Sequence, residues 1–446
     1  MSSRLIDRVR NAQQKAQGGD SGTEEFTRIK SELHKELVAS LDFEQVQQIS
    51  RDELQLRLRK SLADTINTRQ FPLNRAERDR LVEEILNEIT GLGPLEPLLR
   101  DPSITDILIN GADTVYVERE GRLVRANCTF NSNEHLMQII DRVVSQVGRR
   151  IDESNPMVDA RLQDGSRFNA IIPPLALDGP MVSIRRFGHK AIMAEDLIRL
   201  GAAPKPFMDL MHACIKARLN VLVSGGTGSG KTTMLNVLSS YIPQEHRIVT
   251  IEDAAELKLQ QTHVVRLETR PANLEGEGQI KAEDLLRNAL RMRPDRIIIG
   301  EIRGKEAVDM LQAMNTGHEG SLSTVHANST RDALSQVETM VGMGMTIVTD
   351  QRIREVIARA LDVIIHLDRL PDGSRRVMAI TEVLGMEGNV ITTQDVFSFE
   401  QSGIDAEGKV TGAFQATGVR PHFANKLQRI GIQLPPELFR FRKDVP

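Results

Sequence analysis

The sequence predicts an α/β protein with a parallel sheet in its second half, preceded by a smaller α+β domain and a helical N-terminal region. Three patterns support this prediction. After Pro206, short apolar runs alternate with helical stretches, as in a parallel sheet covered by helices. From Thr105, apolar residues recur at every second position, which is typical of half-buried strands. Before Gly91, they recur every three or four positions, as on one face of a helix.

Composition is that of a globular protein with more than one core. The chain has 446 residues, of which 40% are hydrophobic and 26% charged. No apolar run approaches the ~18 residues that a membrane span requires. The N-terminal segment lacks the apolar core of a secretory signal, so we expect a cytoplasmic protein. Cys128 and Cys214 match neither a disulfide scaffold nor a zinc site, which fits a reducing compartment.

Charge and aromatic content both disfavour nucleic acid as a partner. Lys and Arg total 57 against 61 for Asp and Glu, and the net charge of -4 gives no broad basic surface. The chain has 13 Phe, 2 Tyr and no Trp, which leaves few rings on which single-stranded bases could stack.

The first hundred or so residues are expected to be mostly helical. Residues 1–23 are polar and rich in Gln and Gly, so we interpret them as a flexible tail. Helices are expected over 24–40 and near 51–66 because apolar residues there share one helical face. A third helix follows Pro72 and stops at Gly91.

The α+β domain begins with a strand meander near Thr105 that turns at Glu120–Gly121. A helix near 133–147 follows, and then a hairpin whose turn is Asp164–Gly165. A strand at 181–186 closes the unit. The expected organisation is a flexible tail (1–23), a helical region (24–100), an α+β domain (101–187), a linker (188–206) and an α/β domain with a C-terminal addition (207–446).

The α/β domain is predicted from four buried strands and the segments between them. These strands are expected at Val221–Ser224, Ile248–Ile251, Arg296–Ile299 and Ser321–Val325. A tail from about Val363 adds short strands around the Pro371–Gly373 turn.

The decisive motif is Gly225-Gly226-Thr227-Gly228-Ser229-Gly230-Lys231-Thr232, which matches the P-loop pattern G-x-x-x-x-G-K-[ST]. A predicted strand precedes it and a helix follows, so backbone N–H groups converge on one point that suits a di- or triphosphate. Lys231 is expected to reach the β- and γ-oxygens, and the Thr232 hydroxyl to bind Mg²⁺. A flexible glycine-rich turn is the alternative, and both flanking elements argue against it. The predicted nucleotide contacts are Gly226, Thr227, Gly228, Ser229, Gly230, Lys231, Thr232 and Thr233.

We therefore expect the second half of the chain to be a RecA-like nucleotide-binding domain. A P-loop does not by itself prove hydrolysis, which also needs an acid at the same sheet edge. The strand from Arg296 to Ile299 leads directly into Glu301, whereas Asp295 lies at its other end. At ~3.3 Å per residue the two carboxylates should be on the order of 20 Å apart. Glu301 is therefore the predicted catalytic acid and, directly or through water, a magnesium ligand. An exposed loop glutamate is the alternative reading.

Three further carboxylates follow the strand that ends near Ile251. They are Glu252, Asp253 and Glu256. Clustered at the phosphate end of the sheet, such acids polarise the attacking water or hold Mg²⁺ through its waters. We predict catalytic roles for Glu252 and Glu256 and a nucleotide-site role for Asp253, and the sequence does not separate these roles.

Two histidines flank the last predicted strand of the sheet. His318 precedes it, and His326 follows it at the carboxyl end, where it is placed to sense the γ-phosphate. Both are candidate nucleotide-site residues. A structural role is the alternative for each, and it is stronger for His318.

These motifs resemble those of the type II and type IV secretion ATPases and, within them, the CpaF-type motors of tight-adherence (Tad) pili. The resemblance covers roughly residues 80–400. It is carried by the P-loop GGTGSGKTT, the aspartate box TIEDAAEL (250–257), the modified Walker B motif RMRPDRIIIGEIRG (291–304) and the histidine box TGHEGSLSTVHA (316–327). The segments RLQDGSRFNAIIPP (161–174) and VSIRRF (182–187) are similar to the family's N-terminal domain.

The resemblance implies ATP and Mg²⁺ as cofactors, a homo-hexamer, and a location at the inner face of the bacterial inner membrane with platform proteins as partners. It also implies that the N-terminal domain supplies arginines to the nucleotide, and the candidates are Arg161, Arg167, Arg185 and Arg186. Arginine suits this task because its planar fork binds phosphate bidentately and keeps its charge. The implied function is ATP-driven assembly, and also retraction in some systems, of a pilus or secretion of protein subunits.

Two alternatives stay open from the sequence. A conjugative or DNA-translocating ATPase of the same superfamily would share every motif above. A nucleotide-gated scaffold would bind ATP with little turnover. The direction of work and the role of the N-terminal helices are not written in these motifs.

Overall fold

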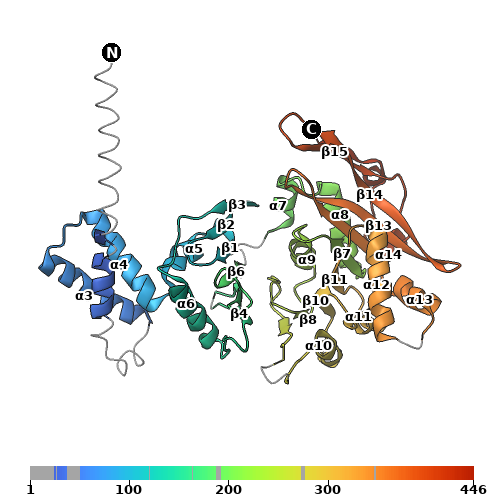
Figure 1. The fold of residues 1–446 in the computed structure, drawn as a ribbon. Helices are drawn as coiled ribbons and strands as arrows, with labels where there is room; N and C mark the ends of the chain where they lie inside the picture. The colour runs from blue at the N-terminus through green and yellow to red at the C-terminus, as the bar shows by residue number, and fades with distance from the viewer. Residues whose placement is uncertain are drawn as a thin grey trace, which may run out of the picture. The chain divides into compact units, whose positions relative to one another are not determined.

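Two compact units make up the chain, Met1–Gly188 and His189–Pro446 (Figure 1). The computed structural model describes residues 25–26, 28–37, 51–119, 121–162, 164–186, 192–272, 277–345 and 348–445. The predicted tail, residues 1–23, lies outside the described residues.

The N-terminal helices pack around their own apolar core. Residues 28–37 are helical, and α3 (Arg51–Arg69) and α4 (Arg75–Thr90) follow. α4 begins with a capping box, in which the side chains of Asn74 and Glu77 each accept a backbone N–H of the other residue. The predicted helical periodicity is confirmed here. The core residues include Ile29, Leu33, Leu37, Leu58, Leu62, Ile66, Leu81 and Ile85.

The rest of the first unit is a six-stranded antiparallel sheet with one long helix on it. Its strand order is β3-β2-β1-β6-β5-β4, and apolar side chains of α6 share a core with the strands. The predicted meander, helix and 164–165 hairpin are confirmed. The elements are η1 (Gly93–Leu95), α5 (Glu96–Arg100), β1 (Ile104–Asn110), β2 (Val115–Arg119), β3 (Arg122–Arg125), α6 (Asn133–Gln146), β4 (Met157–Arg161), β5 (Arg167–Ile171) and β6 (Met181–Arg185).

The second unit is built on a ten-stranded sheet of order β16-β15-β14-β13-β12-β7-β11-β10-β8-β9. The six strands from β12 to β9 run parallel, and the C-terminal strands continue the same sheet in antiparallel fashion. The parallel strands are β7 (Val221–Gly225), β8 (Ile248–Glu252), β9 (Val264–Glu268), β10 (Arg296–Ile302), β11 (Leu322–His326) and β12 (Val363–Arg369). The predicted RecA-like α/β fold is confirmed. β9, an edge strand, escaped the sequence prediction.

Helices cover both faces of the parallel part. Val221 and Val223 of β7 belong to one core and Leu222 to the other, as expected when successive side chains of a strand point to opposite faces. The first core takes α7 (Ala194–Arg199), α8 (Lys205–Lys216) and α9 (Lys231–Ser240). The second takes α10 (Ala282–Ala289), α11 (Glu306–Asn315), α12 (Thr330–Gly344) and α13 (Asp350–Ala360), which Figure 1 draws in olive to orange.

Two expectations about the ends of this unit need correction. The stretch expected to be a linker, 188–206, contains α7, and Leu197 and Ala203 are buried in the first core. The C-terminal strands, expected to be short, form part of the main sheet, and β13 and β14 are long, with 13 and 15 residues. The C-terminal strands are β13 (Arg375–Glu387), β14 (Val390–Ile404), β15 (Val410–Ala416) and β16 (Arg442–Val445), accompanied by α14 (Ala424–Arg429) and η2 (Pro436–Arg440). Phe207 of α8 stacks on Phe397 of β14 at 4.3 Å between ring centroids, which anchors this addition.

Candidate nucleotide site

The P-loop joins β7 to α9 at the carboxyl edge of the parallel strands. Gly228 and Gly230 have φ values of 72° and 99°, a left-handed conformation that glycine adopts without a steric penalty. The loop therefore turns tightly onto the first turn of α9, where the free backbone N–H groups favour an anion. The Ser229 hydroxyl closes the loop by donating to the Gly226 carbonyl at 2.9 Å.

Lys231 lies over the loop that it follows. Its Nζ donates to the carbonyl oxygens of Gly225 at 2.9 Å and Gly226 at 3.0 Å. Burial lowers the pKa of Lys231, and the negative charge of Glu301 opposes that shift. The predicted Walker B acid therefore lies near enough to the P-loop lysine to influence its pKa.

Glu301 is held by an arginine two residues further along the chain. Arg303 donates to Oε2 of Glu301 through Nη2 at 2.6 Å and through Nε at 3.0 Å, and its Nη1 donates to Asp253 Oδ2 at 3.3 Å. One guanidinium thus joins an acid near the end of β10 to the acid that follows β8. Asp295 caps the other end of β10, where its Oδ2 accepts the Arg247 N–H at 2.8 Å.

The three acids after β8 differ in their surroundings. Glu252 is buried, and its Oε2 accepts the backbone N–H groups of Glu256 at 2.7 Å and Leu257 at 2.9 Å. Burial raises the pKa of Glu252, and these two hydrogen bonds oppose the rise. Asp253 is exposed and Glu256 is half-buried. The geometry favours Glu252 as the residue that shapes the loop and leaves Asp253 and Glu256 as the acids turned toward solvent.

The two predicted histidines lie at opposite edges of the sheet. His326 ends β11 and is in register with Gly225 of the P-loop strand, so it lies at the phosphate edge. His318 precedes β11 and therefore lies at the amino edge, where its Nδ1 is buried without a hydrogen-bond partner in the described part of the chain. The structure does not bring His318 to the P-loop of its own chain.

The four predicted arginines belong to the first unit, and three of them form a row across its sheet. Arg161 of β4 faces Arg167 of β5, and Arg167 faces Arg185 of β6. Directly opposed residues share a face of the sheet, and like charges there are unfavourable. Arg186 differs because it is buried and donates to the backbone carbonyls of Asp101 and Ile104. Its guanidinium holds the chain before β1 instead of facing outward.

Sequence reasoning missed a buried histidine beside the P-loop strand. His366 of β12 lies 3.0 Å from the Ser224 hydroxyl through Nδ1, and its ring also hydrogen-bonds the backbone of Asn328, in the loop after His326. It thus links the P-loop strand to the loop that follows the histidine box. The sequence gives little indication of this position for His366, because only the pairing of β12 with β7 places it beside Ser224.

Acidification should destabilise the chain partly through His366. Burial lowers the pKa of His366 in the folded state. Protonation therefore favours the unfolded chain, and stability present above pH ~6.5 is lost as the pH falls below that value. His366→Asn keeps a hydrogen-bonding side chain but does not titrate. Urea unfolding at pH 7.5 and 5.5 should show a smaller loss of unfolding free energy for the variant. An equal loss in both proteins would contradict this assignment.

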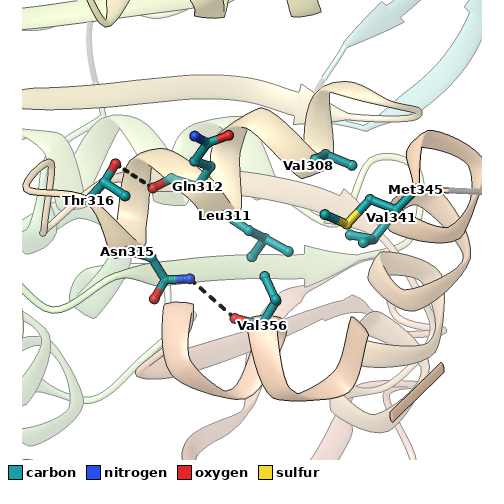
Figure 2. Close-up of a pocket in the computed structure, with 8 residues that line it drawn as sticks. All are labelled: Val308, Leu311, Gln312, Asn315, Thr316, Val341, Met345 and Val356. Atoms are coloured by element: carbon teal, nitrogen blue, oxygen red, sulfur yellow. Dashed lines mark hydrogen bonds between the residues drawn. The ribbon is translucent and has the colours of Figure 1, made fainter. Parts of the chain in front are cut away.

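A separate cavity of about 210 Å³ lies among α11, α12 and α13 (Figure 2). Its lining is mostly apolar, and none of the predicted site residues lines it, so we distinguish it from the nucleotide site. Thr316 and Asn315 at its rim donate to backbone carbonyls of Gln312 and Val356. The lining residues are Val308, Leu311, Gln312, Asn315, Thr316, Val341, Met345 and Val356.

Comparison with known proteins identifies the family. The family described as type II/IV secretion system protein matches residues 88–414, which is more than half of the chain. The chain belongs to this secretion ATPase family. The predicted membership of the type II and type IV secretion ATPases is therefore confirmed. Within the described residues, no helix combines the length and apolarity needed to cross a membrane.

Relatives of this chain include proteins named for conjugal transfer and for type IV secretion. A Mycobacterium tuberculosis protein provisionally named for conjugal transfer is 38% identical over 309 residues, covering 68% of this chain and 87% of that protein. The type IV secretion system protein VirB11 of Bartonella henselae is 30% identical over 335 residues, covering 67% and 93%. The crystal structure of the VirB11 ATPase of Brucella suis in complex with sulphate matches 64% of this chain and 91% of its own at 28% identity, with a TM-score of 0.36.

Proposed function

We propose that this chain is a hexameric ATPase motor that powers assembly of a Tad or type IV-like pilus, or the secretion of protein subunits, through an inner-membrane platform, with pilus retraction as the alternative direction of work. The observation that carries the proposal is the convergence at one sheet edge of the P-loop, Glu301, Asp253 and His326. The chain has only 2 Cys, so it lacks the four-cysteine zinc module of some pilus-extension relatives, which favours the CpaF-type branch.

The residues at this edge fit ATP and Mg²⁺. The P-loop N–H groups and Lys231 would hold the phosphates, and the Thr232 hydroxyl and Glu301 would hold Mg²⁺, directly or through water. Bound MgATP would supply the phosphoryl group for transfer to water. Asp253 and Glu256 are the acids best placed by exposure to orient that water, and Glu252 would support their loop. His326 would report the state of the γ-phosphate.

The turnover of purified full-length chain with MgATP tests the enzymatic part of the proposal. Measurable phosphate release whose rate per subunit increases with protein concentration would support an assembled ATPase. Tight ATP binding with negligible turnover would instead support a nucleotide-gated scaffold.

A conjugative function is the second candidate, because the Mycobacterium tuberculosis relative carries a conjugal-transfer name. Deletion of the gene in the organism that encodes it separates the two. Loss of surface filaments in electron micrographs with normal DNA transfer would support the pilus. Loss of DNA transfer with normal filaments, together with salt-dependent DNA binding by the purified chain, would support conjugation.

Arginines of the first unit should act on the nucleotide of a neighbouring subunit. Arg185 is the best candidate for a test, since its side chain is 60% exposed and it pairs with Asp106 at 3.1 Å without being buried. An arginine delivered to a transferring phosphoryl group is worth ~10³-fold or more in rate. Arg185→Ala should therefore lower kcat strongly while ATP affinity changes little.

Mixing variants shows whether the arginine acts between subunits. Arg185→Ala and Lys231→Ala are each expected to be inactive alone. In a mixed ring, some intact P-loops would face intact arginines, and turnover should partly recover. Subunit exchange is shown independently by energy transfer between labelled chains. No recovery despite exchange would mean that Arg185 acts within its own chain or only maintains the domain.

A further inference from the structure

The hairpin formed by β12 and β13 lies directly beside the P-loop. β12 pairs in parallel with β7, and Leu367 is in register with Gly225, the first P-loop residue. The hairpin turns over residues 370–374, and Arg369 and Arg375 are paired with each other directly beside this turn. These arginines belong to the same chain and the same unit as the P-loop.

The hairpin contacts the P-loop along its length. At the start, a Cβ on Gly225 would come within 2.5 Å of the Leu367 carbonyl oxygen, so only glycine allows this approach. In the middle, Arg375 Nε donates to the Gly228 carbonyl at 2.7 Å. At the end, a Cβ on Gly230 would lie 3.6 Å from Cδ of Arg375. The Arg375 side chain thus spans the second half of the loop.

The next residue ties the hairpin to the C-terminal strands. Arg376 points to the other face of β13, is buried, and donates through Nη2 to the Val410 carbonyl at 2.9 Å. Its guanidinium also lies 4.7 Å from the centroid of the Phe399 ring. Asp372 in the turn accepts the Val410 N–H at 2.9 Å. Both backbone groups of Val410, at the start of β15, are therefore held by the hairpin.

We propose that Arg375 is a positioning residue of the nucleotide site, which fixes the P-loop through the Gly228 carbonyl from a hairpin anchored on β15. In a trans peptide the C=O and the following N–H point in opposite directions, so holding the Gly228 carbonyl also fixes the Ser229 N–H. A loop whose N–H groups are fixed in advance binds phosphate without a further ordering cost. The inference rests on the proposed nucleotide-binding function.

Equilibrium binding of fluorescent ADP and of a non-hydrolysable ATP analogue tests the proposal on the full-length chain. Arg375→Ala should raise Kd for both nucleotides about tenfold, because the P-loop holds the β-phosphate that they share and a hydrogen bond from a charged donor is lost. Arg375→Lys keeps the charge without the planar Nε–H and should lie between wild type and Arg375→Ala. kcat at saturating ATP should fall less than about threefold, because the contacts made in the transition state are not removed.

The control is Arg442→Ala on β16, an exposed arginine of the same sheet that pairs with Asp444. It should bind both nucleotides as wild type does. Unchanged Kd values for Arg375→Ala would overturn the inference and leave nucleotide binding intact. A loss confined to the ATP analogue, with a large fall in kcat, would also overturn it, because Arg375 would then contact the γ-phosphate. Failure of the wild type to bind either nucleotide would remove the proposed function as well.

A double-mutant cycle with Asp372 tests the anchoring separately. Asp372→Ala removes the bond to Val410 and the two bonds that Ser374 donates within the turn, without touching the P-loop, and it should weaken ADP binding in the wild-type background. In the Arg375→Ala background the same change should have no further effect, because the link to Gly228 is already broken. Additive effects would show that the hairpin does not act through Arg375. Thermal unfolding of each variant confirms that the compared chains are folded.

Discussion

Lys231→Ala is expected to abolish ATP turnover. Lys231 is the only cationic side chain of the P-loop sequence, and its Nζ is already fixed over the loop by the Gly225 and Gly226 carbonyls. Alanine removes the charge that balances the β- and γ-phosphates and leaves these carbonyls without their donor. Phosphate release should fall by a factor on the order of 10³ or more, as for loss of a major charge-stabilising group in phosphoryl transfer.

A matched lysine variant shows that the loss is local. Lys409→Ala removes an exposed lysine that pairs with Glu407 in the C-terminal addition, and it should keep wild-type turnover. Thermal unfolding of both variants should resemble that of the wild type. Turnover near the wild-type rate in folded Lys231→Ala would remove the nucleotide-site assignment.

The edge of the sheet could be predicted because its residues are fixed by strand direction. Glu301, Glu252 and His326 each follow or end an apolar run, and parallel strands bring all such ends together. The same rule places His318 at the other edge, since it precedes β11. The sequence motif drew attention to both histidines, whereas strand polarity alone separates them.

The roles of individual side chains could not be predicted in the same way. Arg375 contacts the P-loop across 147 residues of sequence, and no spacing rule links the two segments. Arg186 has the same residue type and neighbourhood as Arg185, yet burial directs it to backbone carbonyls. Glu252 and Asp253 are adjacent, and only the path of the loop decides that the first is buried. Tertiary packing decides each of these outcomes.

Two arginines of the second unit itself lie at the nucleotide site. A P-loop without a nearby arginine would have to borrow one, but Arg303 and Arg375 lie at the site within the same unit. The case for arginines from a neighbour now depends on the row formed by Arg161, Arg167 and Arg185. Arg167 and Arg185 of this row already pair with Asp159 and Asp106, so these arginines would have to exchange a carboxylate for a phosphate when they act on a nucleotide.

Glu301→Gln is expected to bind MgATP yet hydrolyse it at least ~10²-fold more slowly than the wild type. Glutamine keeps the size of Glu301 but loses the negative charge that organises Mg²⁺ and the attacking water. A rate loss of this size is typical when an acid–base group is removed from an active site. The change also removes the ion pair with Arg303 and leaves at most a hydrogen bond to a neutral amide oxygen. The Arg303 side chain is 63% exposed, and such pairs contribute only about 0–1 kcal/mol, so the fold should survive. Single-turnover hydrolysis and equilibrium ATP binding on the same preparation separate the chemical step from affinity.

Asp295→Asn is the matched control, because it is an equally conservative change at the other end of β10. Asparagine retains an oxygen that can accept the Arg247 N–H, so the strand end should stay capped. We expect hydrolysis close to the wild-type rate. If Asp295→Asn stops hydrolysis with ATP binding and fold intact, while Glu301→Gln turns over normally, then the catalytic acid is not the one at the carboxyl edge. The position of Glu301 at the P-loop edge, near enough to influence the pKa of Lys231, would then need an explanation other than catalysis.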